Sequence, residues 1–318
     1  MILDSRTRAA ALLSCAAFFL CACGGSGSRQ TATVSSATVD GGVVATTSVL
    51  GALVRSVAGG AVPVDTLVPV GSSPETYEPA PQDVVRLSHA RLVVLNGAGL
   101  EVWLEKLLRA AASQQASILV LSDGIVVSPS SLPAAAGRSQ SARAFLNPHL
   151  WLDPIYAQAY VRRIQTALVR QFPAQARVIN QNTAAELARL QQLHRWIQAQ
   201  IATVPPSKRA MLTFHDAWYY FDKRYGIRDL GAIESSPGKE PSAAEFAALV
   251  DRAKANHVRA IFAEPEFSRK LADQLAASAG TKTVIDLYDD SLGTEPGMDS
   301  YEGMMHHDVS AIVAGLKI

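Results

Sequence analysis

The sequence predicts an α/β protein with two lobes, each built on a parallel sheet flanked by helices, joined by one long helix. Two observations favour this fold. Short β-branched runs alternate with amphipathic stretches in residues 42–174 and again in residues 205–318, and this alternation is typical of parallel sheets. Between them, residues 175–203 contain neither Gly nor Pro, so a single helix is expected. With 318 residues and 48% apolar content, the chain is long enough for two lobes.

The predicted elements follow this alternation in order. In the first lobe, strands are expected at residues 43–47, 61–68, 91–95 and 117–121, and helices begin near Ser48, Pro81 and Leu100. Another helix is expected after Asp153, because Asp is a favoured N-cap and Pro154 suits the first helical position. In the second lobe, strands are expected at residues 210–213, 227–233, 258–262 and 283–287, and helices begin near His215, Pro241, Phe267 and Tyr301.

The connecting segment, residues 175–204, has a helical pattern of apolar residues. Leu187, Leu190, Leu193, Ile197 and Ile201 recur three and four positions apart, and two prolines follow the segment. A single helix between two lobes predicts a stiff hinge, and hence a smaller closing movement than extended linkers would permit.

The N-terminal segment reads as a secretory signal. Arg6 and Arg8 precede an apolar run, residues 9–22, that is shorter than the roughly 20 residues needed to span a bilayer. The run ends in Leu-Cys-Ala-Cys, which resembles the bacterial lipobox, so residues 1–22 would be removed and Cys23 would carry a lipid. A plain signal peptide cleaved elsewhere is the alternative. Residues 23–41, rich in Gly, Ser and Thr, are expected to form a flexible tether.

Composition excludes several functions. Lys and Arg total 29 against 28 for Asp and Glu, so no basic stripe for nucleic acid is expected. All three cysteines, Cys15, Cys21 and Cys23, lie in the N-terminal segment, so a metal site in the folded part must use nitrogen and oxygen ligands. The common catalytic signatures are absent from the sequence.

Four segments with polar residues stand where an open α/β sheet binds ligands, just after strands or in the loops beyond them. They are residues 73–79, 147–154, 213–218 and 289–293. Each alone has an ordinary structural explanation, such as a cap or a solvated loop side chain. Together they supply two imidazoles and two carboxylates, two from each lobe, which would bind a divalent ion and cancel its charge. A metal site in the cleft between the lobes is therefore expected.

The sequence resembles the metal-binding receptors of zinc and manganese ABC importers, a family that includes adhesin lipoproteins. The resemblance covers nearly the whole mature chain. It rests on runs at residues 77–83 (Tyr-Glu-Pro-x-Pro-x-Asp), 147–154 (Asn-Pro-His-x-Trp-Leu-Asp-Pro), 214–218 (Phe-His-Asp-Ala-Trp), 262–265 (Phe-x-Glu-Pro) and 300–305 (Ser-Tyr-x-x-Met-Met). It implies a monomeric, extracytoplasmic, lipid-anchored receptor without catalytic activity, which delivers its metal to a membrane permease. It also implies that Glu75, His149, His215 and Asp290 are the ligands.

One position departs from the family pattern. The first ligand is commonly His after Asp-Pro, whereas this chain has Glu75 after Ser73-Pro74. Either the Glu75 carboxylate replaces the imidazole, which we favour, or water completes a shell of three protein ligands. Glu264 matches a family position near the site, where it would hydrogen-bond a ligating His or be buried as a paired carboxylate. Asp289, next to the proposed ligand, is expected to serve the turn.

The metal and two other functions stay open at this point. Two imidazoles and two carboxylates suit Zn2+, although bidentate carboxylates would raise the coordination number and accept Mn2+. Family members with manganese often have a carboxylate at the position of His215, so the imidazole favours zinc. A zinc hydrolase would need an open coordination position, and a receptor for a chelate or another solute would need a larger pocket.

Overall fold

The computed structural model describes residues 41–110, 116–125, 147–284 and 286–318. Two four-stranded sheets are formed, and all of their strand pairs are parallel. The first has the order β2-β1-β3-β4, and its strands are β1 (Val43–Ala45), β2 (Val64–Thr66), β3 (Leu92–Leu95) and β4 (Ser117–Val120). The second has the order β6-β5-β7-β8, with β5 (Ala210–His215), β6 (Arg228–Glu234), β7 (Ala260–Phe262) and β8 (Lys282–Val284). The predicted pair of parallel α/β sheets is confirmed.

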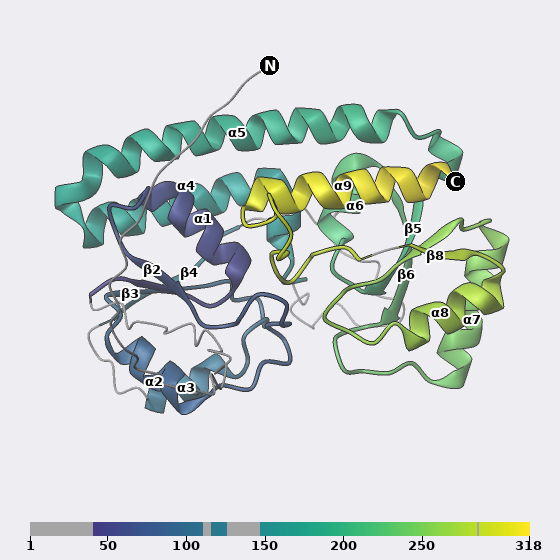
Figure 1. The fold of residues 1–318 in the computed structure, drawn as a ribbon, viewed down its shortest axis with the longest axis horizontal. Coiled ribbons are helices and arrows are strands. Elements are labelled where there is room, and N and C mark those ends of the chain that lie inside the picture. Colours follow the sequence, from purple (N-terminus) through teal and green to yellow (C-terminus); the bar gives the residue numbers. More distant parts are fainter. Residues whose placement is uncertain (1–40, 111–115, 126–146, 285) are drawn as a thin grey trace, which may run out of the picture. The chain divides into compact units, whose positions relative to one another are not determined.

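Helices flank both sheets (Figure 1). Those of the first lobe are α1 (Ser48–Ala58), α2 (Pro81–Ser88), α3 (Leu104–Ala110) and α4 (Pro154–Gln171), with a 3-10 turn at Leu150–Leu152 before α4. The helices that follow β5 in the chain are α6 (Tyr219–Tyr225), α7 (Ala243–Ala255), α8 (Lys270–Ala279) and α9 (Tyr301–Lys317). As predicted, Asp153 caps α4: its side chain accepts a hydrogen bond from the backbone N–H of Ile155, and Pro154 is the first helical residue.

The predicted long helix is α5 (Ala176–Ala202), with 27 residues. In Figure 1 it runs past both sheets, with α4 and α9 beneath it. One cluster of buried apolar residues extends from β1 and α1 through α4 and α5 to α6 and α9, including Val43, Leu190, Phe221 and Ile312. Exposing apolar surface to water costs roughly 25 cal/mol per Å², and separating these elements would expose the shared core. The shared core therefore favours a limited relative movement of the two sheets.

Three helices begin later than the sequence predicts. The helix expected near His215 begins at Tyr219, because β5 extends to His215, which pairs with Glu234 of β6. The helix expected near Leu100 begins at Leu104, since the Glu101 side chain instead accepts hydrogen bonds from backbone N–H groups just after β3. The helix expected near Phe267 begins at Lys270.

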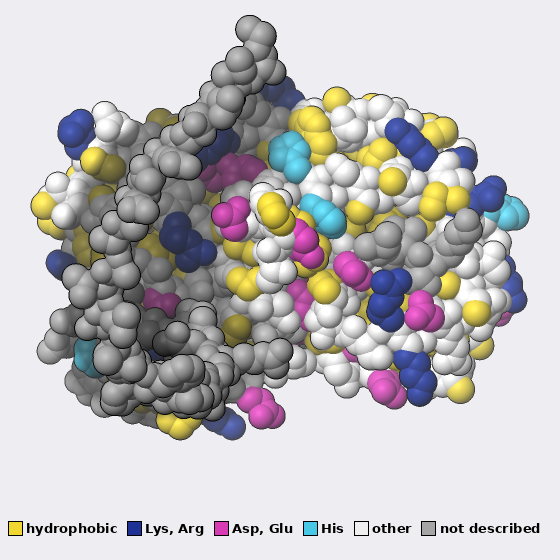
Figure 2. All heavy atoms as spheres, viewed as in Figure 1, with side chains coloured by type: hydrophobic (Ala, Val, Ile, Leu, Met, Phe, Trp, Pro, Cys, Tyr) yellow, Lys and Arg dark blue, Asp and Glu magenta, His cyan; other side chains and the backbone are white. Residues whose placement is uncertain are grey.

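The described surface mixes charges of both signs. Figure 2 shows Lys and Arg side chains interspersed with acidic and apolar ones on the face in view. Among the described residues, no helix is long and apolar enough to cross a membrane.

Candidate metal site

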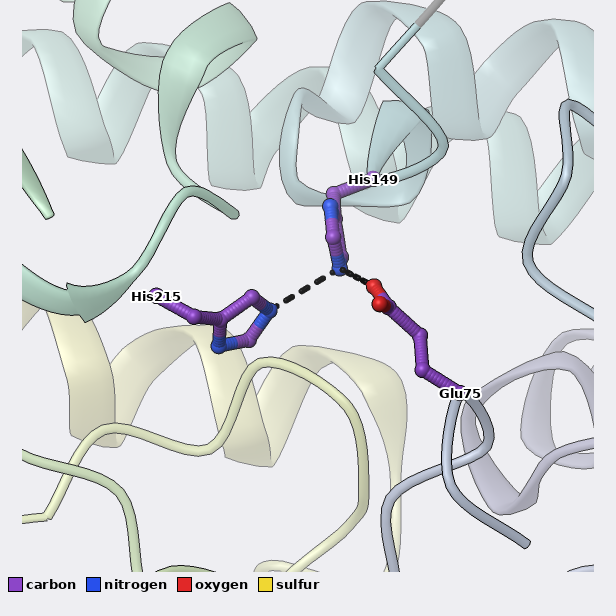
Figure 3. Close-up of side chains that lie close together, drawn as sticks. All are labelled: Glu75, His149 and His215. Carbon is purple, nitrogen blue, oxygen red and sulfur yellow. Dashed lines mark hydrogen bonds and ion pairs between the residues drawn. The ribbon is translucent and has the colours of Figure 1, made fainter. Parts of the chain in front are cut away.

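The structure brings the four predicted ligand residues to one place. Glu75 lies in the loop between β2 and α2, and His149 directly precedes the 3-10 turn that leads into α4. His215 is the last residue of β5, and Asp290 lies in the segment after β8. Glu75, His149 and His215 point toward one another (Figure 3), and each offers a ligand atom within 4.8 Å of the others. Asp290 is outside that group of three but contacts His149.

The two imidazoles meet through the same kind of atom. Nε2 of His149 lies 3.1 Å from Nε2 of His215. Nδ1 of His149 lies 2.9 Å from Asn147 Oδ1, which also accepts the backbone N–H of His149, while the Asn147 amide nitrogen donates to the carbonyl of Asp216. This pattern fixes the Asn147 oxygen as an acceptor, so His149 carries its proton on Nδ1. The Nε2 lone pair of His149 is left for a cation or a shared proton.

Glu264 holds the second imidazole. It follows β7, and its Oε2 lies 2.6 Å from Nδ1 of His215, while its Oε1 accepts the backbone N–H of His215 at 3.2 Å. Burial raises the pKa of Glu264 well above its ordinary value. With Nδ1 engaged, Nε2 is the atom that faces His149. A carboxylate behind a histidine is a common way to orient a metal-ligating imidazole.

The two carboxylates approach His149 from different loops. Glu75 Oε1 and Asp290 Oδ1 each lie 3.4 Å from His149 Nε2. Asp290 is 1% exposed, and its Oδ1 has no hydrogen-bond donor among the described residues. Neighbouring corners of a zinc tetrahedron with bonds of roughly 2.0–2.1 Å are roughly 3.3–3.4 Å apart. The three distances measured from His149 Nε2, 3.1, 3.4 and 3.4 Å, are therefore close to the spacing of donors that share one ion. Asp290 would have to move closer to the other ligand atoms to complete a compact shell, because it lies outside the group of three.

The carboxylates dominate the electrostatics of the site. Burial alone would lower the pKa of His149, but its contacts with Asp290 and Glu75 outweigh burial and raise the pKa to about 9. The pKa of His215 is also raised, because nearby Asp289, Asp290 and Glu75 outweigh its burial. Burial would raise the pKa of Asp290, yet its close contact with His149 and the charge of His215 lower it. The site thus concentrates negative charge and attracts a cation.

Several residues that support the site were not assigned a role from the sequence. Ser73 donates a hydrogen bond to Asp290, and Asn147 orients His149. Asp289 does more than serve a turn, because it is fully buried and accepts hydrogen bonds from the Trp218 indole and from its neighbour's backbone N–H. The family resemblance was the available signal for these residues. The runs that carry it contain Asn147 and Trp218, and one of them begins four residues after Ser73. The predicted lipidation site, Cys23, lies outside the described residues.

Comparisons with known proteins show which family this chain resembles. A family model described as "Zinc-uptake complex component A periplasmic" matches residues 43–315. The chain is 30% identical over 276 residues to the manganese-binding lipoprotein MntA of Halalkalibacterium halodurans, covering 86% of this chain and 88% of the relative. It is 27% identical over 281 residues to the iron ABC transporter substrate-binding lipoprotein MtsA of Streptococcus pyogenes, with the same two coverages.

The fold also matches solved structures. The periplasmic zinc-binding protein TroA of Treponema pallidum superposes with a TM-score of 0.75 at 23% identity, over 87% of this chain and 99% of that one.

Proposed function

Because this chain belongs to the family of periplasmic zinc-uptake components, which are metal-binding receptors of ABC importers and not enzymes, we propose that its cargo is one zinc ion. The ion would bind Glu75, His149, His215 and Asp290 and be released to a membrane permease. Manganese is the alternative cargo. The family's non-enzymatic character removes the hydrolase alternative.

A single observation carries this proposal. Two buried imidazoles, each engaged at Nδ1, direct their Nε2 atoms at each other 3.1 Å apart, and oxygens of Glu75 and Asp290 each lie 3.4 Å from Nε2 of His149. Two lone pairs at this distance repel each other unless a proton or a cation lies between them. A divalent ion satisfies both nitrogens and cancels the charge of both carboxylates.

The choice of metal rests on the ligand types. Relatives are named for manganese, iron and zinc, whereas the sequence predicts zinc or manganese. Two nitrogen ligands suit zinc, whereas manganese favours a shell dominated by oxygen. His215 supplies the second of these nitrogens, and its imidazole is buried and hydrogen-bonded to Glu264.

The N-terminal segment and the membrane partner complete the proposed receptor. We propose that the mature protein is an extracytoplasmic monomer held to a membrane by a lipid on Cys23, and that residues 23–41 act as a tether. The relatives described as lipoproteins support the anchor. The permease partner follows from membership of a family of ABC importer receptors.

Elemental analysis of protein purified without added metal, followed by competition between Zn2+, Mn2+ and Fe2+, tests the cargo. We expect one zinc per chain, and zinc outcompeting both other ions. The His149→Ala variant should lose stoichiometric metal binding. The His89→Ala variant, which changes an exposed histidine outside the proposed site, should bind metal as the parent does. Failure of all three ions to bind the parent would overturn the receptor proposal, and preferential retention of manganese or iron would overturn zinc.

A further inference from the structure

Ser73 bridges the two loops that supply the proposed carboxylate ligands. Its hydroxyl donates a 2.7 Å hydrogen bond to Oδ2 of Asp290, which lies 217 positions away in the sequence. The same hydroxyl oxygen accepts the backbone N–H of Glu75 at 3.3 Å. Ser73 is 6% exposed, so water does not compete freely for these bonds. One hydroxyl therefore positions both Glu75 and Asp290.

The two oxygens of Asp290 consequently differ. Oδ2 accepts a hydrogen bond from the Ser73 hydroxyl, whereas Oδ1 has no hydrogen-bond partner in the part of the chain that the structure describes and lies 3.4 Å from Nε2 of His149. Rotation of the carboxylate to present both oxygens to an ion would break the Ser73 bond and leave a buried hydroxyl without an acceptor. Leaving a buried hydroxyl without a partner costs more free energy than one hydrogen bond contributes to stability in net terms.

The segment that carries Asp290 is also held at its other positions. The Ser291 hydroxyl accepts the backbone N–H of Gly71, and the backbone N–H of Leu292 donates to the hydroxyl of Ser48 at the start of α1. The Trp151 indole donates to the carbonyl of Asp289. These contacts come from the first lobe, so the backbone of the segment cannot easily shift to restore the bond from Ser73 after Asp290 rotates.

We infer that Ser73 is a positioning residue that restricts Asp290 to a single-oxygen ligand and so favours zinc over manganese. The inference rests on the proposed function of the site. A carboxylate that offers one oxygen keeps the coordination number near four, the number usual for zinc in protein sites. A carboxylate free to offer both oxygens raises the coordination number and adds an oxygen ligand, which suits manganese.

The test compares Ser73→Ala with Ser73→Thr, which keeps the hydroxyl, and with Ser72→Ala, which changes the adjacent serine. Each variant is titrated with Zn2+ and with Mn2+, and the ratio of the two dissociation constants is measured. Zinc-bound samples are also examined by X-ray absorption to obtain the coordination number. Melting of the metal-free proteins checks that each variant is folded.

We expect Ser73→Ala to weaken zinc binding by about 10-fold or more, as is typical when a hydrogen bond to a metal ligand is lost. Manganese binding should weaken less, so the preference for zinc falls, and the coordination number should rise. Ser73→Thr and Ser72→Ala should retain the parent's ratio. An unchanged ratio in a folded Ser73→Ala protein, or an equal loss of affinity for both ions, would overturn the inference while the receptor function stands. Absence of metal binding by the parent would instead overturn the proposed function.

Discussion

His149 and His215 face each other through their Nε2 atoms at 3.1 Å, although one precedes α4 and the other ends β5. Each ring is fixed at Nδ1 by an oxygen, from Asn147 for the first and from Glu264 for the second. The pair is therefore held in a geometry that needs a positive charge between the rings. A proton supplies that charge in one state and a metal ion in another, so the two compete.

This competition predicts how stability depends on pH. The pKa of His149 is raised from 6.5 to about 9, so the metal-free fold keeps a proton that the unfolded chain loses. The resulting stabilisation is fully present below pH 6.5 and is lost as the pH rises through about 9. Metal binding must displace this proton, so affinity should increase about tenfold per pH unit in the same window.

Thermal melting with a chelator and with excess zinc, at several pH values from 6 to 9, measures both effects. The melting temperature of the metal-free protein should fall as the pH rises, and the increment produced by zinc should grow. At a thousandfold excess over the dissociation constant, zinc should add about 4 kcal/mol to the free energy of unfolding. An increment that is the same at pH 6 and pH 8.5 would mean that the imidazoles are not ligands.

Glu264→Gln is expected to weaken zinc binding by about 10–100-fold without removing a ligand. Gln keeps the size of the side chain but has one acceptor oxygen, so it cannot accept from both Nδ1 and the backbone N–H of His215 as Glu264 does, and the ring is held less firmly. Glu266→Gln is the matched control, because it removes a nearby carboxylate that has no hydrogen-bond partner among the described residues. Equal effects of both changes on zinc affinity would show that only the local charge matters.

Local sequence patterns predict most elements of the fold, because strand and helix periodicities depend on neighbouring residues. The cap of α4 at Asp153 is an example, since its hydrogen bond spans two positions. The bond from Ser73 to Asp290 joins residues 217 positions apart, and no periodicity reports such a contact. The segments that meet at the candidate site could be located because ligands of open α/β sheets bind beyond the carboxyl ends of the strands, and the family resemblance indicated the four residues within them. Their supporting hydrogen bonds could not, because these depend on how the two lobes pack.

Asp153→Ala is expected to lower the free energy of unfolding by about 2 kcal/mol, without an effect on zinc affinity. The change removes the α4 cap, which contributes roughly 1 kcal/mol. It also removes the partner of Arg224 of α6, whose Nε and terminal guanidinium nitrogen both lie 2.7 Å from Asp153. The Arg224 side chain is 33% exposed, so solvent screening reduces that second contribution.

Urea unfolding of the metal-free protein measures this loss. Asp251→Ala, at an exposed position of α7, serves as the control and should change stability by no more than about 0.5 kcal/mol. A similar small change for Asp153→Ala would contradict a stabilising role for the cap and its contact with α6.

Cys23→Ala should move the protein from the membrane fraction to the soluble fraction of cells. The lipid is expected on the Cys23 side chain and new N-terminus, and residues 23–41 separate it from the folded part, so zinc affinity should not change. Fractionation and titration of the same preparation measure both properties. A variant that stays in the membrane fraction would indicate an uncleaved N-terminal segment instead of a lipid anchor.

Glu75→Gln tests the position at which this chain departs from the family pattern. Glu75 Oε1 lies 3.4 Å from His149 Nε2, and the side chain is 18% exposed, so the carboxylate reaches the site from its edge. If the carboxylate is a ligand, Gln removes a formal charge at constant size and leaves only an amide oxygen. Zinc affinity should then fall by well over the ~10–100-fold that is typical when a residue hydrogen-bonded to a metal ligand is changed. Glu78→Gln, three residues along and exposed, is the matched control and should bind as the parent does.

Glu75→His completes the test by changing the ligand type. It would give three imidazoles and one carboxylate, so we expect zinc binding to be retained and manganese binding to weaken, because manganese favours oxygen ligands. Titrations with both ions, made in parallel on the parent and on the Glu75 and Glu78 variants, measure these effects. If Glu75→Gln binds zinc as tightly as the parent, Glu75 is not a ligand, and water must complete a shell formed by His149, His215 and Asp290.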